Sequence, residues 1–236
     1  MSSIDDIINR QFRQWEMERQ ERQDLPPAVE LPMAIVTVSR EHGSRGGYFA
    51  SLLAENMQYK LIHKDIVDAI CDSSGYRKKI ISSLDEHYRS RVELMIESFL
   101  TGQAVDHSDY TKYLVSVVFS MARLGGVVLV GRGGNFILGP DQGFHLRFIC
   151  PREERILNLA TYSGLTEKAA AAAVEKSDDE RRNLMRKLFD ADIDDPHHYD
   201  MVINSAYVDL EGLVDPVIEA IDLKMRRLAE ARDYDV

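Results

Sequence analysis

The segment HGSRGG, from His42 to Gly47, concentrates residue types that bind phosphate. Its glycines allow backbone N–H groups to turn inward and approach an anion closely. The segment lies between a short apolar run, Met33–Val38, and a helical pattern, so a helix N-terminus would add a positive dipole end. A tight strand-to-helix turn without a ligand is the alternative interpretation. The predicted phosphate-binding residues are Gly43, Ser44, Arg45, Gly46 and Gly47.

The same segment is an incomplete Walker loop. That loop reads GxxxxGK[ST], and its lysine reaches the β- and γ-phosphates while its hydroxyl binds magnesium. Here Arg40 stands at the first glycine position, Gly46 at the lysine position and Gly47 at the hydroxyl position. Arg45, which is next to the lysine position, is the predicted substitute for the missing cation.

A second glycine cluster, Gly131–Gly134, contains Arg132 and follows the apolar run Val127–Val130. A guanidinium at the end of a buried strand can donate a two-pronged hydrogen bond to a phosphate. A structural ion pair is the alternative interpretation.

Three arginines lie in the alanine- and charge-rich helical stretch Thr166–Phe189. Arg182 and Arg186 are one turn apart on one face, and Arg181 points elsewhere. Asp178 has helical spacing for a pair with Arg181 or Arg182. A solvated, ion-paired face is the alternative to a ligand-binding role.

Other polar residues carry weaker signals. Asp65 follows a predicted strand and is predicted either to cap the next helix or to contact a ligand. The neighbouring His197 and His198 do not predict a metal site, because adjacent residues rarely converge on one ion. Cys71 and Cys150 lie far apart without a CxxC partner and are interpreted as buried thiols.

Short apolar runs alternate with helical patterns along most of the chain. Parallel connections need crossovers, so this alternation predicts an α/β fold with a parallel sheet flanked by helices. Ligands in such folds bind beyond the carboxyl ends of the strands, where both glycine clusters lie. Residues 64–124 form a predicted helical insertion. The expected strands are 33–38, 59–62, 127–130, 144–149 and 201–204.

The N-terminal 24 residues place apolar side chains at helical spacing and precede Pro26-Pro27. This extra helix is interpreted either as an arm packed on its own domain or as a segment for homodimerisation. The N-terminus lacks the pattern of a secretion signal, and no apolar stretch approaches the roughly 20 residues of a membrane span. A cytoplasmic protein is expected. The net charge of −10 disfavours nucleic acid and anionic membranes as partners.

Several motifs in order resemble the cytidylate kinase-like family, relatives of the bacterial cytidylate kinases among P-loop nucleoside monophosphate kinases. SREHGSRGG resembles its S-R-E-[aromatic]-G-S-G-G segment, and VGRGG resembles the counterpart of a GRD segment. FICPREER resembles the strand and P-x-E-x-R that lead to a lid. KSDDER and DPHHYDMVIN resemble K-x-D-x-x-R and D-P-x-x-Y-D-x-x-x-N. The resemblance extends from Met33 to about Ile221.

The resemblance implies a P-loop NTPase-type domain at 31–232, with a lid at about 163–195 and an N-terminal arm at 1–30. It implies a kinase that transfers the γ-phosphoryl of ATP, bound with Mg2+, to CMP, dCMP or a similar small acceptor. Arg132 and Arg181 would then bind the acceptor phosphate, and Arg182 or Arg186 would cover the transferring phosphoryl group. Asp65 and Asp178 would contact the acceptor nucleotide. No residue is assigned as a metal ligand.

Two departures leave other functions open. The Walker lysine and hydroxyl are missing, and Gly133 stands where true cytidylate kinases have an aspartate. A catalytically impaired nucleotide-binding sensor or partner-binding protein is therefore the main alternative to an enzyme. A third interpretation is phosphotransfer to another small acceptor, because folds of this class act on many substrates.

Overall fold

The computed structural model describes residues 34–75, 77–78 and 108–233, together with positions 9, 10, 13, 17, 90, 93, 94, 97 and 101. The predicted N-terminal arm and the middle of the predicted helical insertion lie outside the described residues, apart from those scattered positions.

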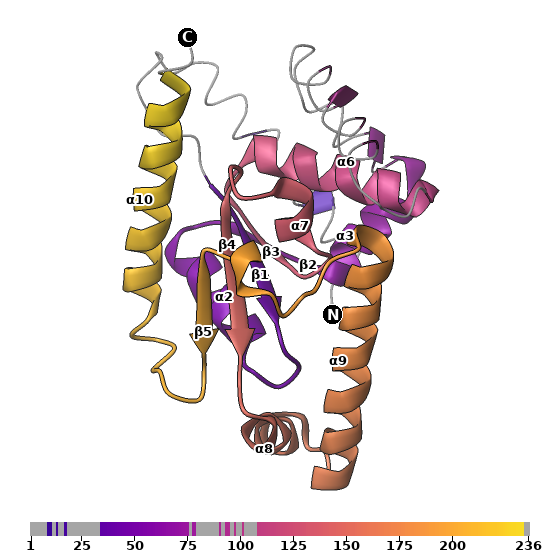
Figure 1. Ribbon diagram of the computed structural model, residues 1–236, viewed down its shortest axis with the longest axis vertical. Coiled ribbons are helices and arrows are strands. Elements are labelled where there is room, and N and C mark those ends of the chain that lie inside the picture. The colour runs from indigo at the N-terminus through magenta and orange to yellow at the C-terminus, as the bar shows by residue number, and fades with distance from the viewer. Residues whose placement is uncertain are drawn as a thin grey trace.

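Five parallel strands form one sheet in the order β2-β3-β1-β4-β5, with β1 at the centre (Figure 1). In register, Val38 of β1 lies opposite Val130 of β3 and Leu146 of β4. The predicted α/β, P-loop-type parallel sheet is therefore confirmed. The strands are β1 (Ile35–Arg40), β2 (Lys60–His63), β3 (Val127–Val130), β4 (Phe144–Ile149) and β5 (Met201–Asn204).

Helices cover both faces of the sheet, and the alternation of side chains along the strands builds a core on each face. Ile35 and Leu129 pack on one face, while Val36 and Val128 pack on the other. The first face carries α3 (Lys64–Asp72), α6 (Asp109–Leu124), α7 (Gly134–Leu138) and the end of α9 (Glu167–Phe189). The second face carries α2 (Gly46–Asn56) and α10 (Val214–Asp233).

The long helix α9 has two different environments along its length (Figure 1). Near its start, Ala170 and Val174 pack against Leu159 of α8 (Arg152–Ser163). At its end, Met185 and Phe189 belong to the main core. The helix thus joins the α8 region to the sheet domain, and the lid role of 163–195 stays a prediction.

Cys71 and Cys150 are both buried and free, which confirms their interpretation as buried thiols. Among the described residues, no helix has the length and apolar character needed to cross a membrane. A short 3-10 turn, η1 (Pro196–His198), leads from α9 into β5.

Candidate phosphate-binding site

Two side chains of α8 form hydrogen bonds with the backbone of the loop between β1 and α2. The Asn158 amide donates a hydrogen bond to the Gly43 carbonyl at 2.9 Å, and the Arg155 guanidinium reaches the His42 carbonyl at 3.5 Å. In a trans peptide the N–H points opposite to the C=O of the preceding residue. The N–H of Gly43 therefore faces away from α8.

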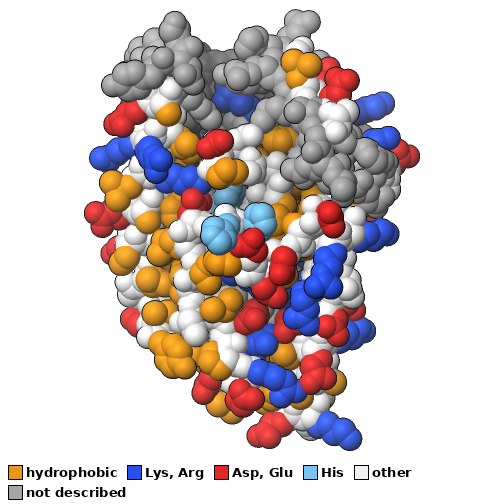
Figure 2. All heavy atoms as spheres, viewed as in Figure 1, with side chains coloured by type: hydrophobic (Ala, Val, Ile, Leu, Met, Phe, Trp, Pro, Cys, Tyr) orange, Lys and Arg blue, Asp and Glu red, His pale blue; other side chains and the backbone are white. Residues whose placement is uncertain are grey.

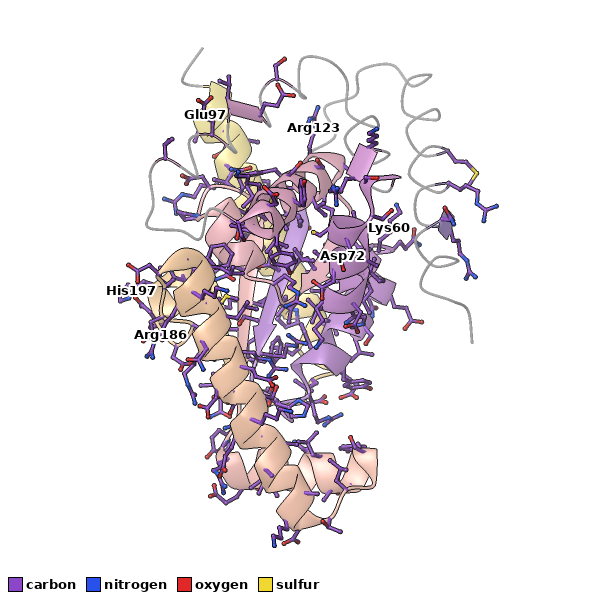
Figure 3. All side chains as sticks on the ribbon, turned by 90° about the vertical axis from the view of Figure 1, so that its right-hand side faces the viewer. Lys60, Asp72, Glu97, Arg123, Arg186 and His197 are labelled. Atoms are coloured by element: carbon purple, nitrogen blue, oxygen red, sulfur yellow. The ribbon has the colours of Figure 1, made fainter. Side chains whose placement is uncertain are left out.

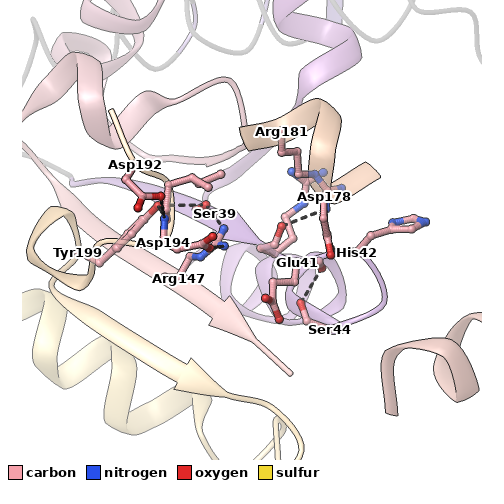
Figure 4. A network of polar contacts seen from close by, with 12 residues as sticks. Ser39, Glu41, His42, Ser44, Arg147, Asp178, Arg181, Asp192, Asp194 and Tyr199 are labelled. Carbon is pink, nitrogen blue, oxygen red and sulfur yellow. Dashed lines mark hydrogen bonds and ion pairs between the residues drawn. The ribbon is translucent and has the colours of Figure 1, made fainter. Parts of the chain in front are cut away.

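Arg155 also forms the centre of a buried ion-pair cluster, which we call the Arg155 cluster. Its guanidinium lies 2.5 Å from Asp178 of α9 and 3.5 Å from Glu41. Glu41 accepts a hydrogen bond from the Cys150 N–H at 2.7 Å. Asp178 accepts one from the His42 N–H at 3.4 Å (Figure 4). These contacts fix the loop between β4, α8 and α9. Asp178 therefore positions the loop in this structure.

The loop retains free N–H groups. The Ser44 N–H is used within the loop, donating to the Glu41 carbonyl at 3.3 Å, and the Phe49 N–H begins the helical bonding of α2. Within the described part of the chain, no acceptor is found for the N–H groups of Gly43, Gly46 or Gly47. Unsatisfied donors at the start of a helix attract anions, as the predicted phosphate role requires.

A cavity of about 130 Å³ lies beyond the carboxyl ends of β1 and β3, against α9. Its described lining contains four basic side chains and one carboxylate, that of Glu180. The local field is therefore positive even though the chain carries a net charge of −10. Small-molecule pockets usually enclose about 300–1,000 Å³, so this cavity has room for a phosphate group but not for a whole nucleotide. The basic residues are Arg40, Lys64, Arg132 and Arg181.

Arg40, the last residue of β1, is the cavity arginine that the sequence analysis did not assign to the site. Its guanidinium passes so close to Gly131 that a Cβ on that glycine would lie 2.9 Å from Nη1. Burial, followed by the charges of Arg181 and Arg132, lowers the pKa of Arg40 to about 10. The available signal was its position: an arginine stands where a Walker loop has its first glycine.

The structure brings the two predicted acceptor-phosphate residues, Arg132 and Arg181, to this one cavity. Arg132 follows β3 with a left-handed backbone (φ 56°) and forms an ion pair with Asp68 of α3. Burial acts to lower the pKa of Arg132, but the hydrogen bond with Asp68 and nearby groups outweigh it and raise the pKa. Arg181 donates to the Arg40 carbonyl at 3.1 Å, and burial lowers its pKa.

Arg45, the predicted lysine substitute, lies apart from the cavity. Its backbone is left-handed (φ 59°). The guanidinium lies 5.0 Å from the ring centroid of Tyr48 and 5.6 Å from that of Tyr162. These are cation–π distances, so the side chain has aromatic rather than phosphate-directed contacts here.

Apart from Arg132 and Arg181, the other predicted residues also lie outside the cavity lining: Gly43, Ser44, Gly46, Gly47, Asp178, Arg182, Arg186 and Asp65. Arg182 pairs with Asp179 at 2.6 Å on the solvated side of α9. Arg186 is exposed and points outward (Figure 3). Asp65 is exposed in the first turn of α3, whose N-cap is His63. The prediction that Asp65 caps this helix is therefore wrong.

The side chains around the loop do not fit a magnesium ion held by the protein. Gly47 offers no oxygen at the hydroxyl position, and the carboxylates beside the loop, Glu41 and Asp178, are engaged by Arg155. No group of three or more metal-binding side chains occurs in the described residues. His197 and His198 both contact the carboxylate of Asp195. The face drawn in Figure 2 shows histidine side chains beside carboxylates.

Comparisons with known proteins identify the family of this chain and support its fold. The model of the cytidylate kinase-like family matches residues 35–207. A cytidylate kinase of Ignicoccus hospitalis is 25% identical over 101 residues, which are 43% of this chain and 59% of that protein. A uronate isomerase of Corynebacterium glutamicum is 35% identical over 95 residues, which are 40% of this chain and 18% of that protein.

One solved structure is similar over most of its length. It is an uncharacterized protein from Eubacterium ventriosum with a TM-score of 0.61 and 20% sequence identity. The similarity covers 80% of this chain and 98% of that protein, and it supports the fold.

Proposed function

Because this chain belongs to the cytidylate kinase-like family, we propose that it transfers the γ-phosphoryl group of MgATP to a nucleoside monophosphate. The family and the P-loop kinase-like fold support a phosphotransferase of the nucleoside monophosphate kinase type. CMP or dCMP is the acceptor that the family resemblance suggests. A similar small acceptor is the broader form of the proposal.

One observation carries the proposal: a small, positively charged cavity lies at the carboxyl edge of the sheet, at the end of β1, and the glycine loop that follows β1 has unused N–H groups. Phosphoryl transfer needs little covalent participation from a protein. It needs the two substrates held in line and the negative charge on the phosphoryl oxygens stabilised. Arginines and oriented N–H groups supply that stabilisation.

The proposed roles follow the positions of the groups. The N–H groups of loop 43–47 hold the donor phosphates, and Arg132 and Arg181 hold the acceptor phosphate. Asp178 is a positioning residue, because it fixes the loop through Arg155 and the His42 N–H. Magnesium arrives with ATP as part of that substrate.

The size of the cavity makes a movement of α9 part of the proposal. Ser177, Arg181 and Met185 of this helix line the cavity, so a shift of α9 would enlarge it for a nucleotide. Closure afterwards would exclude water from the phosphoryl group. The proposed covering role of Arg182 or Arg186 depends on such a movement, since both side chains lie outside the cavity lining.

The test incubates the protein with MgATP and a panel of acceptors: CMP, dCMP, UMP, AMP and GMP. ADP formation is followed by a coupled assay and nucleotide binding by calorimetry. The proposal expects ADP formation that depends on one monophosphate, with the corresponding diphosphate as the second product. Nucleotide binding without acceptor-dependent ADP would instead identify the catalytically impaired sensor. Absence of nucleotide binding would contradict both functions.

A further inference from the structure

The lysine position of the Walker pattern has no space for a side chain. A Cβ on Gly46 would lie 2.7 Å from the Phe148 Cβ and 2.8 Å from the Arg40 Cβ. Carbon atoms in proteins essentially never approach so closely, and Phe148 is fully buried. At Gly47, by contrast, an added Cβ would meet nothing within 4 Å. The packing of β1 and β4 therefore specifically excludes a lysine at position 46.

One of the two residues that crowd Gly46 is Arg40, the arginine that stands at the first Walker glycine. We propose that Arg40 and Gly46 have exchanged roles, so that Arg40 supplies the phosphate-binding cation from the strand side of the loop. This inference rests on the proposed function for its ligand, the phosphate tail of a nucleoside triphosphate. In the Walker pattern the glycine stands at the first position and the lysine six residues later, whereas here Arg40 stands at the first position and Gly46 at the lysine position.

The path of the Arg40 side chain supports the exchange. It leaves the end of β1, runs past Gly131 and lines the cavity together with Arg132 and Arg181. An added Cβ on Gly131 would lie 2.9 Å from the flexible Nη1 end of Arg40, and the backbone φ of 88° favours glycine at this position. The guanidinium thus lies in the cavity together with Arg132 and Arg181, the two arginines proposed to hold the acceptor phosphate.

The charge environment of Arg40 is that of a site for an anion. Arg181, Arg132 and Arg147 act on Arg40 as like charges that lower its pKa, and the more weakly acting Asp65 is the carboxylate that opposes them. Across the described residues, no carboxylate forms an ion pair with Arg40. A buried cation among like charges is unfavourable unless an anion compensates it, and a triphosphate is an anion of sufficient charge.

Inorganic tripolyphosphate tests the inference, because it carries the proposed tail without a nucleoside. Calorimetry would compare the wild type, Arg40→Met, Arg40→Lys and Arg227→Met at one fixed salt concentration. Arg227 is an exposed arginine on α10, so its variant controls for the loss of one charge. We expect Arg40→Met to weaken binding by about tenfold or more, Arg40→Lys by less, and Arg227→Met by under about twofold.

Chemical rescue provides a second measurement. In Arg40→Ala the vacated space opens to the cavity, and added guanidinium ion should restore part of the tripolyphosphate affinity. A merely structural role of Arg40 would give no such rescue, and Arg227→Ala should not respond to guanidinium. Thermal unfolding of each variant shows whether it is folded before its binding is compared.

The outcomes separate this inference from the proposed function. Equal tripolyphosphate binding by Arg40→Met and the wild type would overturn the inference, as would a wild type that binds no tripolyphosphate. Binding that depends on Arg40, in a protein that phosphorylates no acceptor, would support the inference and contradict the kinase function.

Discussion

Arginines lie on two sides of the β1–α2 loop, and the two groups are paired in different ways. At α8, Arg155 is matched by Asp178 and Glu41, and on β4 Arg147 is matched by Asp194 at 2.5 Å. In the cavity, Arg40 has no carboxylate partner among the described residues. Arg155 and Arg147 are matched by carboxylates, and in the cavity Arg132 pairs with Asp68, whereas Arg40 keeps a positive charge that an anion would neutralise.

This difference separates residues that hold the structure from residues available to a ligand. A buried ion pair is expensive to break, because the remaining charge is left without a partner. An unmatched buried cation has the opposite property: it lowers the stability of the empty protein and is compensated when an anion binds. Strongly perturbed ionisable groups in a cavity are accordingly candidates for function.

The largest expected effect is the loss of stability caused by a substitution that breaks the Arg155 cluster. Asp178→Ala leaves the Arg155 charge, whose side chain is 9% exposed, with only the more distant Glu41. We expect a loss of about 3 kcal/mol in the free energy of unfolding and a fall in Tm of about 6–12 °C. The neighbouring Asp179→Ala breaks an exposed pair and should cost under about 1 kcal/mol. A stable Asp178→Ala protein with poor acceptor binding would instead support the ligand-binding role implied by the family resemblance.

Arg132→Ala should affect acceptor use rather than the donor site. Removal of a positioned cation from a developing phosphoryl charge typically lowers the rate by about 10²-fold or more. We expect such a fall in kcat/KM for the monophosphate, with ATP affinity preserved. Asp68→Asn is the control, since it removes the ion-pair partner but keeps Arg132. An unchanged acceptor response in Arg132→Ala would show that its role was misassigned.

Arg40→Met should stabilise the ligand-free protein. The folded-state pKa of Arg40, about 10, lies below its ordinary value of 12.5, so folding disfavours the charged form. That unfavourable contribution is fully present below pH 10 and is relieved as the pH rises from about 10 toward 12.5. We expect a gain of about 2 kcal/mol at pH 8, measured by urea unfolding. The gain should be constant up to about pH 10 and shrink as the pH rises above it; a loss of stability at pH 8 would contradict an unmatched charge.

The smallest effect is expected at Arg45. Its guanidinium contacts Tyr48 and Tyr162 at a partly exposed position. Arg45→Ala should therefore change tripolyphosphate affinity by less than about threefold, the scale of a surface charge interaction. A loss comparable to that of Arg40→Met would restore the sequence-based hypothesis that Arg45 replaces the lysine.

The apolar patterns predicted the strands well. The runs Val127–Val130, Phe144–Ile149 and Met201–Asn204 are strands with the predicted bounds. Consecutive apolar residues identify strands buried on both faces, and the alternation with helices implies parallel pairing. The sheet order could not be predicted in the same way, because it depends on contacts between strands far apart in sequence.

The site was predicted less completely than the fold. The loop and Arg132 were found because their glycines mark backbone conformations that a pattern can show. Arg45 was selected for its proximity along the chain to the lysine position, but its left-handed backbone places the side chain against two tyrosines. The Walker pattern shows Arg40 only as a residue that replaces its first glycine. A role for Arg40 could not be predicted, because the pattern carries no information on the steric exclusion at Gly46.

A crystal structure of the protein with ADP and CMP tests the central claim most directly, namely that the cavity arginines bind phosphate. We predict the CMP phosphate within about 3 Å of the Arg132 and Arg181 guanidinium groups and the ADP phosphates at the loop N–H groups. Arg40 should lie between the two nucleotides. Phosphates bound elsewhere, with the cavity still empty or filled by protein side chains, would contradict the account.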